Sequence, residues 1–224
     1  MSLLFESLLN WKPVRKPVPI TLRGLTVALE PLNAERHAHA LWEAVEGHDG
    51  VWKWLFDGPY ANEAGMRDAL EAKEMAAEAV FLAIEPVETG KAAGYASWMR
   101  IDPSNGVVEV GNILLTPAVQ RTTAATEAMY LMARHVFEDL GYRRYEWKCN
   151  VLNEPSRRAA ERLGFRFEGI FRQHMVIKGQ NRDTAWYSML DHEWPERKRA
   201  FEAWLDPANF DEAGRQRRRL GDRE

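Results

Sequence analysis

The sequence LTPAVQRTTAA, residues 115–125, decides the fold, because a strand-like run leads into it and a helix-like run follows it. The preceding run VVEVGNILL, residues 107–115, is rich in β-branched residues and is typical of a strand. From Thr122 to Leu140 apolar residues recur with a helical period, which predicts an amphipathic helix that ends before Gly141. The small-residue loop between them therefore lies at a helix N-terminus, whose free N–H groups and positive dipole end suit a pyrophosphate.

A second informative stretch is NVLNEPS, residues 150–156, which is followed by ERLGF at residues 161–165. Asn153 is a typical N-cap, Pro155 stands in the first turn, and Gly164 follows the last turn, so a short helix is predicted over 154–163. The strict alternation of RYEWKC, residues 144–149, predicts the strand that leads into this helix.

The remaining segments continue this mixture of strands and helices. Further strands are expected at 24–29, 80–85, 92–101, 166–177 and 184–190, and further helices at 33–46, 62–78 and 193–205. Antiparallel hairpins together with two strand–helix–strand crossovers predict an α/β fold with a mixed sheet and helices on both faces. We expect an irregular N-terminal arm at 1–20, one domain at 21–191, and a C-terminal helical segment with an Arg-rich tail at 192–224.

Composition narrows the class of protein. The 224 residues carry 30 Lys and Arg against 33 Asp and Glu, an ordinary balance for a globular chain. The single cysteine, Cys149, excludes an intrachain disulfide framework and a Cys-rich zinc site, and it fits a reducing, cytoplasmic setting. We expect no metal, no signal peptide and no membrane span. Residues 141–182 contain ten Lys and Arg and four Glu, which suits either an anionic ligand or a solvated surface.

Together, and in this element order, the two stretches resemble the GNAT N-acetyltransferase superfamily, in particular the branch of the ribosomal-protein N-terminal acetyltransferases (RimJ/RimL-like). The resemblance covers roughly residues 20–190. It implies a twisted, mostly antiparallel sheet of about seven strands that splays between strands four and five, here 107–115 and 144–149. It also implies acetyl-CoA as donor and a primary amine, on a small molecule or a peptide, as acceptor.

The resemblance assigns roles to particular residues. The family loop pattern [QR]-x-x-G-x-[GA] is matched by Gln120 and Ala125, whereas Thr123 replaces the usual glycine. A threonine there either narrows the pyrophosphate site or offers its hydroxyl to a phosphate oxygen. The cofactor-binding residues implied are Ile113, Leu114, Leu115, Gln120, Arg121, Thr122, Thr123, Ala124, Ala125, Asn150, Asn153 and Arg158.

Two residues are candidates for proton transfer. The resemblance places Glu109 on the fourth strand as the base that deprotonates the amine; the alternative is a solvent-facing glutamate paired with a cross-strand base. Ser156 is the candidate donor to the departing CoA sulfur; the alternative is a helix-start serine that bonds local N–H groups. Trp52, Trp54 and Asn112 are expected to shape the acceptor site.

Two other functions remain open at this stage. The chain could bind acyl-CoA as a sensor or scaffold without turnover, which the threonine at the glycine position allows. A less favoured alternative is a nucleic-acid partner that uses the basic segment and the arginines of the tail, Arg215, Arg217, Arg218 and Arg219. We expect that tail to be a frayed, solvated end. The tryptophans of the two terminal extensions, at positions 11, 194 and 204, are compatible with packing either onto the domain itself or onto a second copy in a homodimer.

Overall fold

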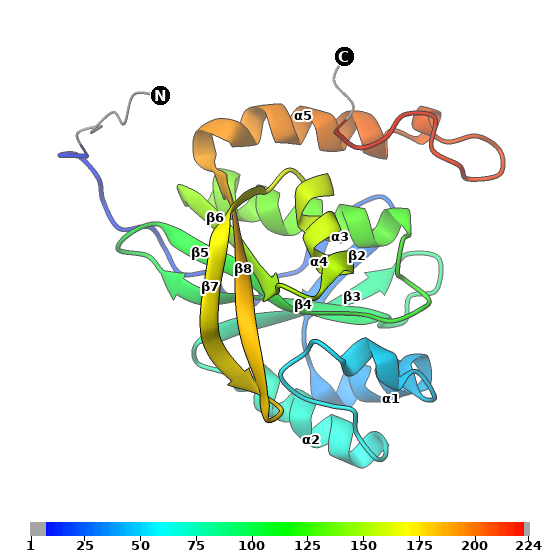
Figure 1. The fold of residues 1–224 in the computed structure, drawn as a ribbon. Helices are drawn as coiled ribbons and strands as arrows, with labels where there is room; N and C mark the ends of the chain where they lie inside the picture. The colour runs from blue at the N-terminus through cyan, green and yellow to red at the C-terminus, as the bar shows by residue number, and fades with distance from the viewer. Residues whose placement is uncertain (1–7, 222–224) are drawn as a thin grey trace.

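A single eight-stranded sheet runs through the computed structural model, which describes residues 8–221 (Figure 1). The strands lie in the order β1-β2-β3-β4-β5-β6-β8-β7. Their bounds are β1 Leu22–Arg23, β2 Val27–Pro31, β3 Ala79–Pro86, β4 Gly94–Asp102, β5 Val107–Leu115, β6 Arg144–Asn150, β7 Arg166–Ile177 and β8 Gln180–Leu190. The sheet is thus the mixed α/β arrangement expected, with one strand more than the expected seven. The extra strand, β1, has two residues and is too short to show alternation in the sequence.

The helices are α1 Ala34–Val45, α2 Glu63–Glu74, α3 Thr123–Arg134, α4 Glu154–Arg162 and α5 Trp194–Leu205. Short 3₁₀ turns occupy Asp49–Trp52, Asp191–Glu193 and Pro207–Asn209, and a π-helical turn, His135–Asp139, extends α3. Helices α1 and α2 cover one face of the sheet, while α3, α4 and α5 lie on the other (Figure 1). Each face has its own hydrophobic core.

Helix boundaries follow local capping. The side chains of Asn33, Asn62, Thr122 and Asn153 each accept a hydrogen bond from a backbone N–H in the first turn of α1, α2, α3 and α4. The helix expected at 62–78 ends four residues early, at Glu74. The Glu74 carboxylate accepts from the N–H of Ala34 at 2.8 Å, so the end of α2 is tied to the start of α1.

The splay of the sheet lies where the resemblance predicts it. Strands β5 and β6 are the parallel pair of the sheet, and their pairing covers only four residues of each, from Val107 with Arg144 to Val110 with Trp147. Beyond that point β5 runs on to Leu115 and β6 to Asn150 without pairing with each other. A strand edge without a partner leaves backbone N–H and C=O groups free for another ligand.

The tail is folded, which corrects the expectation of a frayed end. Asn209 is buried; its side-chain amide donates to the carbonyl oxygens of Trp204 and Arg218 at 3.0 and 3.2 Å. Phe210 and Gln216 form a β-bridge, and Leu220 is buried. Composition did not reveal this fold because the contacts that hold the tail come from α5 and from Asn209. Residues 222–224 lie outside the described part of the chain.

The N-terminal arm has no helix or strand over residues 8–20, and residues 1–7 lie outside the described part. Trp11 fixes the arm to the β4–β5 turn: its Nε1 donates to the carbonyl oxygen of Ser104 at 2.8 Å. Between residues 8 and 221 no helix has the length and apolar character to cross a bilayer. The same residues contain no group of three His, Cys, Asp or Glu side chains arranged to hold a metal ion.

Candidate active site

A cleft of about 1240 Å³ opens where β5 and β6 diverge. Several parts of the chain line it: the aromatic loop 49–60, β5, the start of α3 with its preceding loop, β6 with α4, β8 through Arg182, the end of α5 through Trp204, and the folded tail. Most of the residues implied by the resemblance line this cleft; they are Glu109, Asn112, Ile113, Leu115, Gln120, Arg121, Thr122, Thr123, Ala125, Asn150, Asn153, Ser156, Arg158 and Trp54. Residues far apart in the sequence are therefore brought to one site.

Three of the expected residues do not line the cleft. Trp52 is 2% exposed and packs edge-on against Tyr60, with the ring centroids 5.1 Å apart. The side chain of Leu114 belongs to the core under α1 and α2, and Ala124 packs in the other core. Trp54 lines the cleft together with Val51 and Phe56, so Trp52 supports the wall without forming it.

The loop before α3 is held in a defined shape. The Gln120 amide donates to the carbonyl oxygen of Leu115 at 2.8 Å, and the Thr122 hydroxyl accepts from the N–H of Ala125. Arg121 has a φ of 63°, a left-handed conformation that a non-glycine residue adopts at some cost. The first N–H groups of a helix lack helical acceptors, and Thr122 and Ala125 at this end of α3 line the cleft. Thr123 is the first residue of α3 and lines the cleft.

Positive charge dominates the cleft wall. Among the residues of the described chain that line it, six are cationic, namely Arg121, Lys148, Arg158, Arg162, Arg182 and Arg215, and one, Glu109, is acidic. Arg158 pairs with Glu154 and Arg215 with Asp211, both outside the lining. Of these arginines, Arg121 precedes α3, Arg158 and Arg162 lie on α4, and Arg215 lies in the tail, which fits a ligand with several phosphates.

A bulge shapes the middle of the cleft. The register between β4 and β5 shifts between the pairs Tyr95 with Leu114 and Ser97 with Gly111, and Asn112 lies in this irregularity with a φ of 48°. Asn112 and Ile113 both line the cleft. Bulges re-aim side chains next to active sites, and this one lies on the stretch of β5 that has no pairing with β6.

Ser156 is positioned from two sides. Its N–H donates to the side chain of Asn153 at 3.2 Å, which is the N-cap bond of α4. Its hydroxyl oxygen accepts from Nε1 of Trp147 at 3.0 Å. The hydroxyl therefore bonds the indole of Trp147 and not a helix N–H group as in the local alternative, and its proton is left for an acceptor, with the Cys149 sulfur in reach. Burial raises the pKa of the neighbouring Cys149 thiol, which argues against a thiolate nucleophile.

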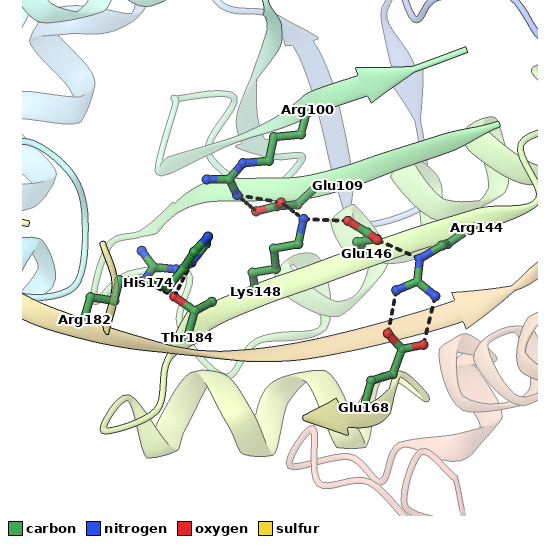
Figure 2. Close-up of polar contacts among 9 residues, drawn as sticks. All are labelled: Arg100, Glu109, Arg144, Glu146, Lys148, Glu168, His174, Arg182 and Thr184. Atoms are coloured by element: carbon green, nitrogen blue, oxygen red, sulfur yellow. Dashed lines mark hydrogen bonds and ion pairs between the residues drawn. The ribbon is translucent and has the colours of Figure 1, made fainter. Parts of the chain in front are cut away.

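Glu109 lies in a network of charges that extends from β4 through β5 and β6 to β7 (Figure 2). Its carboxylate is 3% exposed, so the solvent-facing alternative is wrong, although the pairing with cross-strand bases is correct. Arg100 Nη1 lies 2.7 Å and Lys148 Nζ 2.8 Å from Oε2 of Glu109. Lys148 is itself 3% exposed and also pairs with Glu146 at 2.6 Å. Arg144 continues the network to Glu146 and Glu168.

Several of the lining residues carry no sequence signal for a role in the site. Lys148 and Arg182 stood out only as members of the basic segment 141–182, and Trp147 only as part of an alternating strand. Trp204, near the end of α5, and the tail residues Phe210, Gly214, Arg215 and Gln216 also line the cleft. No local pattern marks them, because their position depends on how residues 206–221 fold back.

Comparisons with known proteins decide the family. A family model described as "Acetyltransferase (GNAT) domain" matches residues 26–166. The chain belongs to the GNAT acetyltransferase family. A solved GCN5-related N-acetyltransferase from Brucella melitensis is 52% identical, with a TM-score of 0.92 over 94% of this chain and 96% of that one. This acetyltransferase thus shares both sequence and fold with a solved member of the family.

Two further similar proteins have names or descriptions that refer to the acetylation of ribosomal proteins. YdaF of Bacillus subtilis, which carries the provisional name of a ribosomal N-acetyltransferase, is 28% identical over 74% of this chain and 90% of its own length. A Salmonella typhimurium acetyltransferase, described as modifying the N-terminal serine of ribosomal protein L7/L12, has a TM-score of 0.64 at 22% identity and covers 75% of this chain and 96% of its own. At that identity the likeness of this acetyltransferase concerns the fold alone.

Proposed function

We propose that the chain transfers the acetyl group of acetyl-CoA to a primary amine by direct attack in a ternary complex. The observation that carries this proposal is the cationic cleft at the splay, with a helix N-terminus at one end and a buried carboxylate farther along. The amine nitrogen forms the new C–N bond and the C–S bond of the thioester breaks. Overall one proton passes from nitrogen to sulfur.

The residues of the cleft fit CoA as the donor. The first N–H groups of α3, with Arg121 and Thr123, would hold the pyrophosphate, and Arg158 and Arg162 would face further phosphate oxygens. Asn150 and Asn153 offer amide groups to the pantetheine arm. The free edge of β5 beyond Val110 supplies backbone N–H groups near Ile113 for the oxygen that gains charge in the transition state.

Glu109 and Ser156 are the proposed proton carriers. A free amine with a pKa of about 8 to 10 is mostly protonated at neutral pH, so attack needs a base. Glu109 accepts this proton, directly or through a water molecule, and the ion pairs to Arg100 and Lys148 hold the carboxylate in place. The hydroxyl of Ser156 donates to the departing sulfur, whose thiol pKa of about 8.5 makes a hydrogen bond sufficient.

Isothermal titration with acetyl-CoA tests the donor site first. We expect micromolar binding by the wild type, a loss of about tenfold in Arg121→Gln, and no detectable binding in Thr123→Asp, which places a carboxylate at the phosphate loop. Arg199→Gln, on the outer side of α5 and outside the cleft lining, is the matched control. If the wild type does not bind acetyl-CoA, or if Thr123→Asp binds as well as the wild type, this donor site is wrong.

One observation favours the catalytically silent acyl-CoA-binding module as a second candidate. Arg100 and Lys148 together make three contacts to the two oxygens of Glu109, so few of the about four lone-pair sites of the carboxylate are left for the proton of an amine. Turnover separates the two functions. Release of CoA that depends on an added amine, and that falls in Glu109→Gln, supports the transferase; CoA binding without amine-dependent release across a broad amine panel supports the silent module.

A further inference from the structure

We propose that the acceptor is an amine that also carries a carboxylate, and that Arg182 binds this carboxylate. The inference deepens the proposed function and rests on it. It begins from one side chain that the transfer chemistry does not use: the guanidinium of Arg182, on β8, which lines the cleft although the residue is only 6% exposed. A buried guanidinium normally has a carboxylate or a comparable anion beside it.

Arg182 has no carboxylate partner among residues 8–221. Its Nε donates to Oγ1 of Thr184 at 3.2 Å, and its guanidinium carbon lies 5.3 Å from the ring centroid of Phe56. The other two nitrogens make no hydrogen bond to the described residues, and neither is fully enclosed. Burial lowers the pKa of Arg182, an effect that the more distant charge of Glu109 opposes. The guanidinium therefore presents two nitrogens to the cleft with its charge unpaired.

The surrounding charges do not neutralise the guanidinium of Arg182. The network drawn in Figure 2 contains four cations, Arg100, Arg144, Lys148 and Arg182, against three carboxylates, Glu109, Glu146 and Glu168. His174 lies beside Arg182, and burial and the nearby cations lower its pKa; a histidine in any case supplies no negative charge. One positive charge remains in excess at this end of the cleft.

The excess positive charge favours an acceptor that carries an anionic group. Lys148 and Arg182 lie on β6 and β8, beyond the phosphate end formed by α3, α4 and the tail, so a second anion is needed to balance Arg182. A carboxylate on the acceptor supplies it, because a guanidinium with two free nitrogens matches the two oxygens of a carboxylate. The same positive field disfavours an ammonium group, so the amine end of the acceptor binds in its neutral, nucleophilic form.

Matched acceptor pairs test the inference on the wild type. The first pairs are glycine, alanine and serine, each against its carboxamide. The second pair is the peptides Ser-Asp-Ala-amide and Ser-Asn-Ala-amide, in which the carboxylate is a side chain. In at least one of the two kinds of pair, we expect the acid to have a kcat/KM about 10- to 100-fold above that of its amide. This ratio corresponds to the loss of one buried, charge-assisted hydrogen bond. The pair that shows the ratio distinguishes a free amino acid from an acidic peptide.

Variants then assign the preference to Arg182. Arg182→Gln should reduce the acid-to-amide ratio to near one while leaving acetyl-CoA affinity unchanged, and Arg182→Lys should retain part of the ratio. Arg199→Gln should keep the wild-type ratio. Equal rates with acids and amides in the wild type, or an equal loss on both in Arg182→Gln, would overturn the inference while the transferase stands. Failure of the proposed function is seen separately, as acetyl-CoA binding without transfer to any amine. If Arg182→Gln does not fold, the wild-type ratios and Arg182→Lys decide.

Discussion

Lys178 donates to the main-chain oxygen of Trp52 at 2.8 Å, although 126 residues separate them. The same ammonium donates to the carbonyl oxygen of Asp57 at 2.7 Å. Lys178 stands in the turn of the β7–β8 hairpin, and residues 49–60 form the aromatic wall of the cleft. The hairpin that carries Arg182 is thus fastened to the loop that faces the proposed acceptor.

Replacing Lys178 should loosen this wall. We expect Lys178→Met to raise the acceptor KM about tenfold, the equivalent of one charge-assisted hydrogen bond, and to leave acetyl-CoA affinity unchanged. Steady-state kinetics gives the KM, and hydrogen exchange of residues 49–60 should show faster opening. Lys91→Met, in the exposed β3–β4 turn, is the control. Unchanged KM and exchange would mean that the contact does not hold the loop.

Asp57 makes the same loop sensitive to acid. Burial alone would raise the pKa of Asp57, but the ion pair with Lys73 and the hydrogen bond from Tyr60 outweigh it and lower the pKa. Because the carboxylate is more acidic in the folded state, its stabilisation is present above the unfolded pKa of about 4 and is lost as pH falls through the folded value.

Asp57→Asn should therefore be less stable than the wild type at pH 7, by about 1 to 3 kcal/mol in the free energy of unfolding. The difference should shrink as the pH falls from 5 toward 2. Urea unfolding at several pH values measures both quantities, and Asp68→Asn on the exposed side of α2 serves as the control. A difference that stays constant with pH would show that the Asp57 carboxylate does not contribute in this way.

The folded tail should contribute to the affinity of the protein for acetyl-CoA. Nε1 of Trp204 donates to Oε1 of Gln216 at 2.7 Å, and the guanidinium of Arg162 lies 4.9 Å from the Trp204 ring. Trp204→Ala removes both contacts and should weaken acetyl-CoA binding about tenfold, whereas Trp204→Phe keeps an aromatic ring and should lose less. Titration of both variants measures this order. Wild-type affinity in Trp204→Ala would exclude the tail from the donor site.

The local sequence patterns predicted those parts of the fold that a few consecutive residues determine. The strand at 107–115, the loop at 116–122 and the N-caps Asn33 and Asn153 need only a few consecutive residues. The place of the splay came from the resemblance, because pairing between β5 and β6 depends on residues about 37 positions apart.

The parts that could not be predicted depend on distant charges. Lys148 is buried only because Glu109 and Glu146, from two strands, meet its ammonium group. The alternation of a strand predicts on which face of the sheet a lysine lies. It does not predict whether neighbouring strands place carboxylates on that face. Likewise the fold of the arginine-rich tail depends on contacts with Asn209 and with Trp204 of α5, which no local pattern in the tail predicts.

Ser156 gives the sharpest test of the chemistry. Its hydroxyl oxygen accepts from Trp147, which leaves its proton for an acceptor; the neighbouring Cys149 sulfur interacts with it in the free protein, and we propose the departing sulfur of CoA as its partner in the reaction. Ser156→Ala should lower kcat about 10- to 100-fold with little change in acetyl-CoA affinity, because the hydrogen bond forms mainly as negative charge develops. Trp147→Phe keeps the serine but removes the hydrogen bond that orients its hydroxyl, so we expect a smaller loss of kcat than in Ser156→Ala.

The Ser156→Ala defect should also depend on the thioester. An acetyl thioester of a more acidic thiol needs less help to leave, so the ratio of wild-type to variant kcat should fall with such a donor. N-cap geometry does not depend on the side chain of Ser156, since Asn153 bonds its backbone N–H. A variant whose kcat equals that of the wild type, or whose defect is the same for every thioester, would remove Ser156 from the proton path.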